Sequence, residues 1–307
     1  MSAREELSRL YPMVQIRKGI WEIDEFDCAS IFLIIGEERA LMIDTGFGIG
    51  DIRGVVEMLT DKPITLVISH SHIDHFGGAY QFEEAWVYEN SPLYTGTGRE
   101  RMGKTMDQIN AGIRDDIRLI ASRQKGHLGY VFSMYNLYGY DIDTMYVHRE
   151  DEPKPVYHPI RDGQSFDLGG RVITCYFCPG HAVDELVFLD ETDRILFSGD
   201  AINYNTTIAA VPLPESIEYL RRVQSMHDRY DVIYNSHHDF RAFGRPLGED
   251  CLPNLLSLAE DYVSGNYAEP SLVPSFWDGQ RTPRMMFRRG GNFMGFRSPG
   301  SEPPHVR

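Results

Sequence analysis

Four residues that can bind a metal lie within six consecutive positions of the chain: His70, His72, Asp74 and His75. They follow the apolar run at residues 64–68, which predicts a buried strand that ends where the cluster begins. In a turn after a strand, the first two His can point to one place while Asp74 and His75 point to a neighbouring place. Imidazole and carboxylate groups are ligands that zinc and other borderline divalent metals prefer. The chain contains 11 His among 307 residues, so this spacing predicts a metal site rather than a chance histidine-rich turn.

The pattern of this cluster, His-x-His-x-Asp-His followed by Gly77-Gly78, resembles the signature of the metallo-β-lactamase superfamily. Four further segments resemble motifs of that family and occur in the family's order. They are the strand that ends in Asp44-Thr45-Gly46, the turn Pro179-Gly180-His181, the turn Ser198-Gly199-Asp200, and the strand that runs into His237-His238. The resemblance covers residues 29 to about 240 and implies an α/β fold, the αββα sandwich of two mixed β-sheets flanked by helices. Periodicity by itself indicates only a mixed α/β chain.

The resemblance also implies a complete ligand set for two divalent metal ions. Three His would hold one metal, two His and one Asp would hold the other, and a second Asp would bridge them: His70, His72 and His181; Asp74, His75 and His237; and Asp200. Zinc is the expected metal, with iron or manganese as alternatives. Two such cations lower the pKa of a shared water from ~15.7 towards 7, which gives hydroxide at neutral pH. Asp74 and Asp200 are therefore the predicted catalytic carboxylates, and Asp74 could also orient the nucleophile or move its proton.

Two departures from the family pattern leave questions open. After His181 the chain reads Ala182-Val183-Asp184-Glu185, where many relatives have small residues that include Thr or Ser. The last motif lacks the usual Gly-His-Gly, so either His237 or His238 could be the final ligand. Because neighbouring strand residues face opposite sides, only one of them is expected to reach the metals. We favour His237, the first position beyond the strand, and place His238 in the outer shell of the site or against solvent.

Several other polar residues are candidates for the site. Asp44, at a strand end beside the ligands, could accept a hydrogen bond from a ligating imidazole and so fix its tautomer, or could cap the following turn. Asn203 and Tyr204 follow the bridging Asp closely and could reach a substrate, although ordinary packing is the alternative for both. Tyr138 and Tyr140 are further candidates for substrate contact.

Residues 1–265 are predicted to form the metallo-β-lactamase-like domain, with an insertion at about 92–150, and residues 266–307 to form a C-terminal arm. The insertion combines a helical face of Met and Ile with a tyrosine-rich stretch. It could close over the metals as a lid, or pack as a contact between two chains. The arm interleaves Arg with Met and Phe. Glycine, proline and charge favour a disordered tail, but the large apolar residues predict an ordered segment lying across an acidic face. Either segment could mediate a homo-oligomer.

Hydrophobic periodicity predicts the elements that position these motifs. The expected strands are 29–35, 39–43, 64–68, 171–177, 186–189 and 194–197, the first two forming a hairpin. An amphipathic helix is expected at residues 51–59. Two later helices are expected, one capped by Ser216 and running through Met226, and one with Pro253 in its first turn.

Charge and cysteine content limit the possible partners. The formal net charge is −15, and residues 281–307 hold six Arg and one Glu, so residues 1–280 carry about −20. An acidic body repels phosphate backbones, which argues against nucleic acid as a partner. No signal peptide or transmembrane helix is evident, and the four Cys do not form a disulfide framework. We therefore expect a cytoplasmic protein without a membrane partner, and we interpret Cys175-x-x-Cys178 as part of a buried strand.

These features predict a metal-dependent hydrolase that attacks the carbonyl of a small lactone, ester, thioester or amide. One alternative is an oxygenase that binds a single iron through His70, His72 and His181 and acts on a thiol or persulfide with O₂. The other alternative, a non-catalytic metal-binding module, is disfavoured by the complete ligand set.

Overall fold

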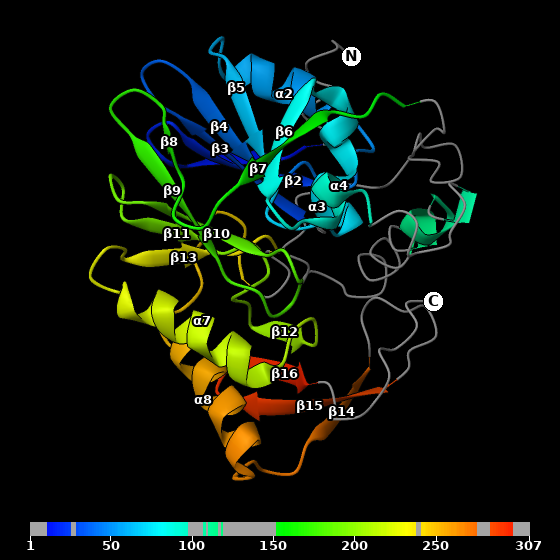
Figure 1. Cartoon of the computed structure of the whole chain (residues 1–307), viewed down its shortest axis with the longest axis vertical. Helices are drawn as coiled ribbons and strands as arrows, with labels where there is room; N and C mark the ends of the chain where they lie inside the picture. Colours follow the sequence, from blue (N-terminus) through cyan, green and yellow to red (C-terminus); the bar gives the residue numbers. More distant parts are fainter. Residues whose placement is uncertain are drawn as a thin grey trace. The chain divides into compact units, whose positions relative to one another are not determined.

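A computed structural model gives the arrangement of the chain (Figure 1). The residues that it describes are 11–25, 29–97, 107–108, 110–115, 118, 152–237, 241–274 and 283–296. The chain divides into two compact units. Unit 1 comprises Met1–Pro159, Asp167–Arg171 and His237–Arg245, and unit 2 comprises Ile160–Phe166, Val172–Ser236 and Pro246–Arg307. His237–Arg245 therefore groups with unit 1, although the chain on both sides of this segment belongs to unit 2.

Unit 1 is built on a seven-stranded sheet whose strands lie in chain order. They are β1 (Met13–Arg17), β2 (Ile20–Glu25), β3 (Ala29–Ile35), β4 (Ala40–Ile43), β5 (Ile64–Val67), β6 (Glu84–Tyr88) and β7 (Val156–Ile160). β1 to β4 pair antiparallel, and β4, β5 and β6 pair parallel. The predicted hairpin is confirmed, with Phe32 opposite Ile43. Every residue of β4 is buried, as expected for an apolar run in the middle of a sheet.

The helix α2 (Ile52–Leu59) confirms the predicted amphipathic pattern. Asp51 precedes it, and its carboxylate accepts a hydrogen bond of 2.8 Å from the Gly54 N–H, which satisfies one of the unpaired amides of the first turn. Ile52, Val55 and Val56 lie in the core of unit 1. Short helices of unit 1 include α3 (Ile73–Phe76), the 3-10 helix η1 (Gly77–Gln81) and α4 (Pro92–Thr95).

Unit 2 contains two sheets. The five-stranded sheet has the order β13-β11-β10-β9-β8 and consists of β8 (Ser165–Asp167), β9 (Val172–Phe177), β10 (Leu186–Asp190), β11 (Ile195–Phe197) and β13 (Val232–Tyr234). The four-stranded sheet has the order β12-β16-β15-β14 and consists of β12 (Asn205–Ile208), β14 (Ser271–Pro274), β15 (Pro283–Arg289) and β16 (Asn292–Phe296). β10 is buried over its whole length, because it lies between two antiparallel neighbours.

Two helices of unit 2, α7 (Leu213–Ser225) and α8 (Cys251–Ser264), pack against each other (Figure 1). The helix with Pro253 in its first turn is confirmed. The prediction that Ser216 caps a helix is wrong, because α7 begins at Leu213 and Ser216 is buried within it. Pro214 explains the earlier start, since proline fits the first turn of a helix, where its missing N–H costs no hydrogen bond.

The described part of the C-terminal arm includes β14 and the hairpin of β15 and β16, and β14 pairs with β15. Gly290 has a φ of +57° in the turn, a conformation that glycine adopts without strain. Phe287 and Met294 are buried in the core of unit 2, and Arg289 forms an ion pair with Asp261 of α8. The described residues of the arm therefore contribute strands to the four-stranded sheet of unit 2.

Most of the predicted insertion lies outside the described residues, and whether it is a lid or a contact between chains stays a prediction. Within the part of the chain that the structure describes, no helix has both the length and the apolar character needed to cross a membrane.

Candidate metal site

The signature cluster of unit 1 lies at a strand end, as the sequence predicted. β5 ends at Val67 and α3 begins at Ile73, so His70 and His72 lie in the connection between them. The C=O of His72 accepts a hydrogen bond of 3.0 Å from the His75 N–H, which starts the helix. Two predicted ligands therefore project from a loop, and the next two from the first turn of a helix.

Asp44 is the buried centre of the hydrogen bonds around this loop. Its Oδ1 accepts from the Ser69 N–H at 2.7 Å, and its Oδ2 accepts from the Ser69 hydroxyl at 2.8 Å and lies 3.0 Å from Nδ1 of His75. A carboxylate can only accept, so Nδ1 of His75 carries the proton and Nε2 is left with the lone pair that a metal requires. The hydrogen bond between Asp44 and His75 is therefore the kind by which Asp44 was predicted to fix the tautomer of a ligating imidazole.

Ser69 extends the influence of Asp44 to a second histidine. Its hydroxyl proton is used by Asp44, so the Ser69 oxygen accepts from Nδ1 of His70, 3.0 Å away. Nε2 of His70 then faces Nδ1 of His72 at 3.0 Å. Sequence reasoning missed Ser69, although its place directly before the first ligand was the available signal. One buried carboxylate thus sets the tautomer of two imidazoles.

Asp74, His75 and His237 form a group that lies entirely within unit 1. One potential ligand atom from each lies within 4.8 Å of the others. Oδ2 of Asp74 is 3.5 Å from Nε2 of His75 and 3.7 Å from Nε2 of His237. Ligands at about 2.1 Å in a tetrahedral site lie roughly 3.4 Å apart, so these separations fit a zinc-sized ion. Among the residues that the structure describes, this group brings together ligands from distant parts of the sequence.

The ionisation of Asp74 suits a metal ligand. Burial alone would raise its pKa, but His75, His237 and His72 lower the pKa well below the usual range of a carboxyl. The carboxylate is therefore charged at neutral pH and available to a cation. Together with the imidazoles of His75 and His237, this carboxylate makes a donor set that zinc and similar divalent metals accept.

The two glycines after the cluster allow a close backbone approach. A Cβ on Gly77 would lie 2.3 Å from the carbonyl oxygen of Phe47, a distance that no side chain can adopt. The Gly78 N–H donates to the Thr45 hydroxyl at 3.0 Å, and this hydroxyl donates to the His75 carbonyl at 2.9 Å. The loop after Asp44 is thereby fastened to the end of the ligand helix.

Glu25 holds the same loop from its other side. Its buried carboxyl accepts from the backbone N–H groups of Phe47 and Ile49 and from the Tyr11 hydroxyl. Burial raises the pKa of Glu25 to about 7, although these hydrogen bonds act in the opposite direction. Glu25 was not singled out from the sequence, because its partners lie more than ten positions away.

Unit 2 carries the other two predicted ligands, His181 and Asp200. Nε2 of His181 is 3.4 Å from Oδ2 of Asp200. Glu185 connects the turns that bear them, because its carboxylate accepts from the Asp200 N–H at 2.7 Å while its backbone carbonyl accepts from the Cys178 N–H at 2.9 Å. Glu185 is fully buried. The departure from the family pattern after His181 therefore supplies a carboxylate that positions Asp200.

We expect Glu185→Ala to lower metal affinity about 10- to 100-fold, as substitutions behind metal ligands do. Glu185→Gln keeps an oxygen that can accept from Asp200 and should retain most of the affinity. Metal content after dialysis against graded chelator measures both, with melting temperature as the control for folding. Equal metal content in Glu185→Ala and the unaltered protein would contradict this role.

The remaining candidate residues either pack within unit 2 or lie outside the described residues. The hydroxyl of Tyr204 accepts a hydrogen bond of 2.7 Å from the Gly248 N–H, and burial raises its pKa. Tyr204 thus has a packing contact within unit 2, and Asn203 is buried. Three candidates lie outside the described residues: Tyr138, Tyr140 and His238.

The Cys-x-x-Cys pair agrees with the buried-strand interpretation. Cys175 lies in β9 and Cys178 directly follows that strand, and both are buried free thiols. Burial raises the pKa of Cys178 to about 12, so its thiol stays protonated at neutral pH.

Residues 25–239 match the family model of the metallo-beta-lactamase superfamily. The chain therefore belongs to this superfamily, and it is an enzyme of its hydrolase class. The fold class predicted from the sequence, the α/β sandwich with mixed sheets flanked by helices, is confirmed. The match includes all seven predicted ligands.

Relatives with assigned activities include two kinds of thioesterase. The acyl-coenzyme A thioesterase MBLAC2 of Homo sapiens is 25% identical over 255 residues, which cover 77% of this chain and 79% of the relative. The atrochrysone carboxyl ACP thioesterase of Aspergillus fumigatus is 27% identical over 134 residues, which cover 43% of this chain and 42% of the relative.

Solved structures show the same fold at low sequence identity. The metallo-beta-lactamase from Pontibacter korlensis is 16% identical with a TM-score of 0.53, over 82% of this chain and 99% of that one. The stereoselective inverting sec-alkylsulfatase Pisa1 from Pseudomonas sp. is 16% identical with a TM-score of 0.55, over 83% of this chain and 42% of that one.

Proposed function

We propose that this protein hydrolyses acyl thioesters with the help of two divalent metal ions, zinc being the expected metal. The observation that carries the proposal is the group of Asp74, His75 and His237, which provides a second set of ligands beyond the three His of a single-metal site. Thioesters are favoured over lactones, esters and amides because a thioesterase relative is similar over more than three quarters of both chains.

The chain's own residues would prepare the site for this reaction. The metals, when bound, supply an activated water and polarise the substrate carbonyl. Asp44 holds the proton of His75 at Nδ1 and, through Ser69, that of His70 at the same atom, so each Nε2 keeps the lone pair that a metal ligand needs. Asp74 remains ionised and could accept a hydrogen bond from the attacking water, which would orient it.

The oxygenase alternative uses these residues less completely. A single iron held by His70, His72 and His181 would leave Asp74, His75 and His237 without a chemical role. The closeness of their ligand atoms supports two metals instead.

Metal analysis combined with a substrate panel tests the proposal. Protein loaded with zinc and then dialysed should contain two zinc ions per chain and should cleave N-acetylcysteamine thioesters faster than the matching oxygen esters and amides. One iron per chain together with O₂ consumption on a thiol would favour the oxygenase. Zinc binding without cleavage of any thioester would remove the proposed substrate class.

A further inference from the structure

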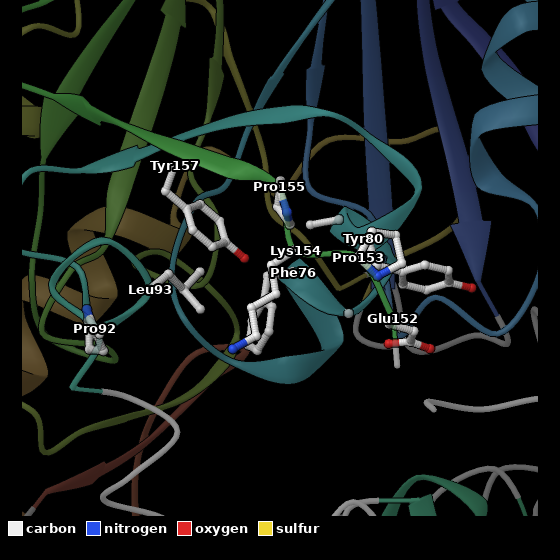
Figure 2. Close-up of a pocket in the computed structure, with 12 residues that line it drawn as sticks. Phe76, Tyr80, Pro92, Leu93, Glu152, Pro153, Lys154, Pro155 and Tyr157 are labelled. Carbon is white, nitrogen blue, oxygen red and sulfur yellow. The ribbon is translucent and has the colours of Figure 1, made fainter. Parts of the chain in front are cut away.

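A pocket of about 130 Å³ lies at the end of the ligand helix, within unit 1. Most of its wall is apolar, and Figure 2 shows Phe76, Leu93 and Tyr157 around one half of it. These three side chains also pack against the core of unit 1, which fixes their positions. The pocket therefore has a wall that is already formed before any ligand arrives.

The described lining of the pocket includes two charged residues and the hydroxyl groups of Tyr80 and Tyr157 (Figure 2). Among the described residues that line it, Glu152 and Lys154 are charged, and Lys154 is exposed. The hydroxyl of Tyr80 donates to the carbonyl of Gly48 at 3.1 Å, so it is engaged with the neighbouring loop. A ligand in the pocket would meet mainly carbon, which favours an apolar group.

Two residues that line the pocket directly follow the predicted metal ligands Asp74 and His75 in the sequence. Phe76 directly follows His75, and consecutive Cα atoms are about 3.8 Å apart. Gly77, the next wall residue, is the glycine that touches the loop after Asp44. The same short helix thus presents Asp74 and His75 as ligands and Phe76 as pocket wall.

The volume limits the size of the group that fits. An engineered cavity of about 150 Å³ with apolar walls binds benzene, so a pocket of 130 Å³ suits roughly six carbons. We propose that this pocket binds the acyl group of the thioester substrate and selects medium-chain or single-ring acyl groups of that size. This inference rests on the proposed thioesterase function and names its substrate class more closely.

Leu93 and Tyr94 offer a matched pair of substitutions on α4. Leu93 lines the pocket, whereas Tyr94 is 46% exposed and does not. Leu93→Trp should fill the pocket and lower kcat/KM for a hexanoyl thioester at least tenfold, with a change below twofold for an acetyl thioester. Tyr94→Trp should change neither. A loss that is equal for both substrates in Leu93→Trp would overturn the proposal.

A binding measurement separates this inference from the proposed function. S-hexyl-N-acetylcysteamine is a thioether that cannot be hydrolysed, and calorimetry can follow its binding to metal-free protein. Binding by the unaltered chain and by Tyr94→Trp, but at least tenfold weaker in Leu93→Trp, would support the pocket even if no thioester were cleaved. Cleavage of thioesters with no preference for six carbons over two, and equal thioether binding in all three proteins, would refute the pocket and leave the proposed function standing. Melting temperatures of both variants confirm that they are folded.

Discussion

Replacing His72 by Ala or Asp200 by Asn should reduce metal content and hydrolysis together. His72→Ala removes a ligand and Asp200→Asn removes the charge of the predicted bridging carboxylate, and loss of an interaction behind a ligand already costs about 10- to 100-fold in affinity or activity. We therefore expect more than 100-fold loss of kcat/KM in either variant. Metal content by mass spectrometry, measured beside thioester turnover, checks the result. Unchanged metal content and turnover in both variants would contradict the ligand assignment.

The last ligand can be distinguished from its neighbour in the same experiment. His237 groups with Asp74 and His75 in the structure, whereas His238 lies outside the described residues. His237→Ala should lose close to one metal per chain, and His238→Ala should keep most of it. The reverse order would move the ligand to His238.

Chelation should abolish activity while leaving most of the fold intact, because each unit has its own apolar core.

The ligand types and the strands before them could be predicted because both depend on local sequence. An apolar run predicts a strand, and the spacing of His70, His72, Asp74 and His75 requires only that the strand ends there. Helix starts were less certain, as Ser216 shows, because several residues in a row can begin a helix.

The residues that orient the ligands could not be predicted in the same way. Ser69 meets Asp44 across 25 positions, and Glu185 meets Asp200 across 15. Such contacts are set by how strands pair, which periodicity does not determine. A buried Glu in an apolar run, such as Glu185, is nevertheless a usable signal, since buried carboxylates need partners.

Glu22→Ala should destabilise unit 1 by about 3–5 kcal/mol, the cost of removing one partner from a buried ion pair. Glu22 is fully buried in β2, and its carboxylate accepts from the Arg241 guanidinium at 2.6 Å, the Gly244 N–H at 2.8 Å and the Ser30 hydroxyl at 2.8 Å. The substitution would leave the buried Arg241 charge without its carboxylate. Chemical denaturation followed by circular dichroism measures the change in the free energy of unfolding.

An exposed pair of the same residue types in unit 1 provides the control. On α2, Nε of Arg53 lies 2.9 Å from Oε1 of Glu57, but the two side chains are 44% and 55% exposed. Glu57→Ala should therefore change the free energy of unfolding by less than about 1 kcal/mol. The double variant Glu22→Leu with Arg241→Met removes both charges and should recover part of the loss, because the penalty comes mainly from an unpaired buried charge. Since Arg241 and Gly244 belong to the segment that begins at His237, Glu22→Ala should also weaken metal binding. If Glu22→Ala cost no more than Glu57→Ala, the segment that carries His237 would have to be held by other contacts.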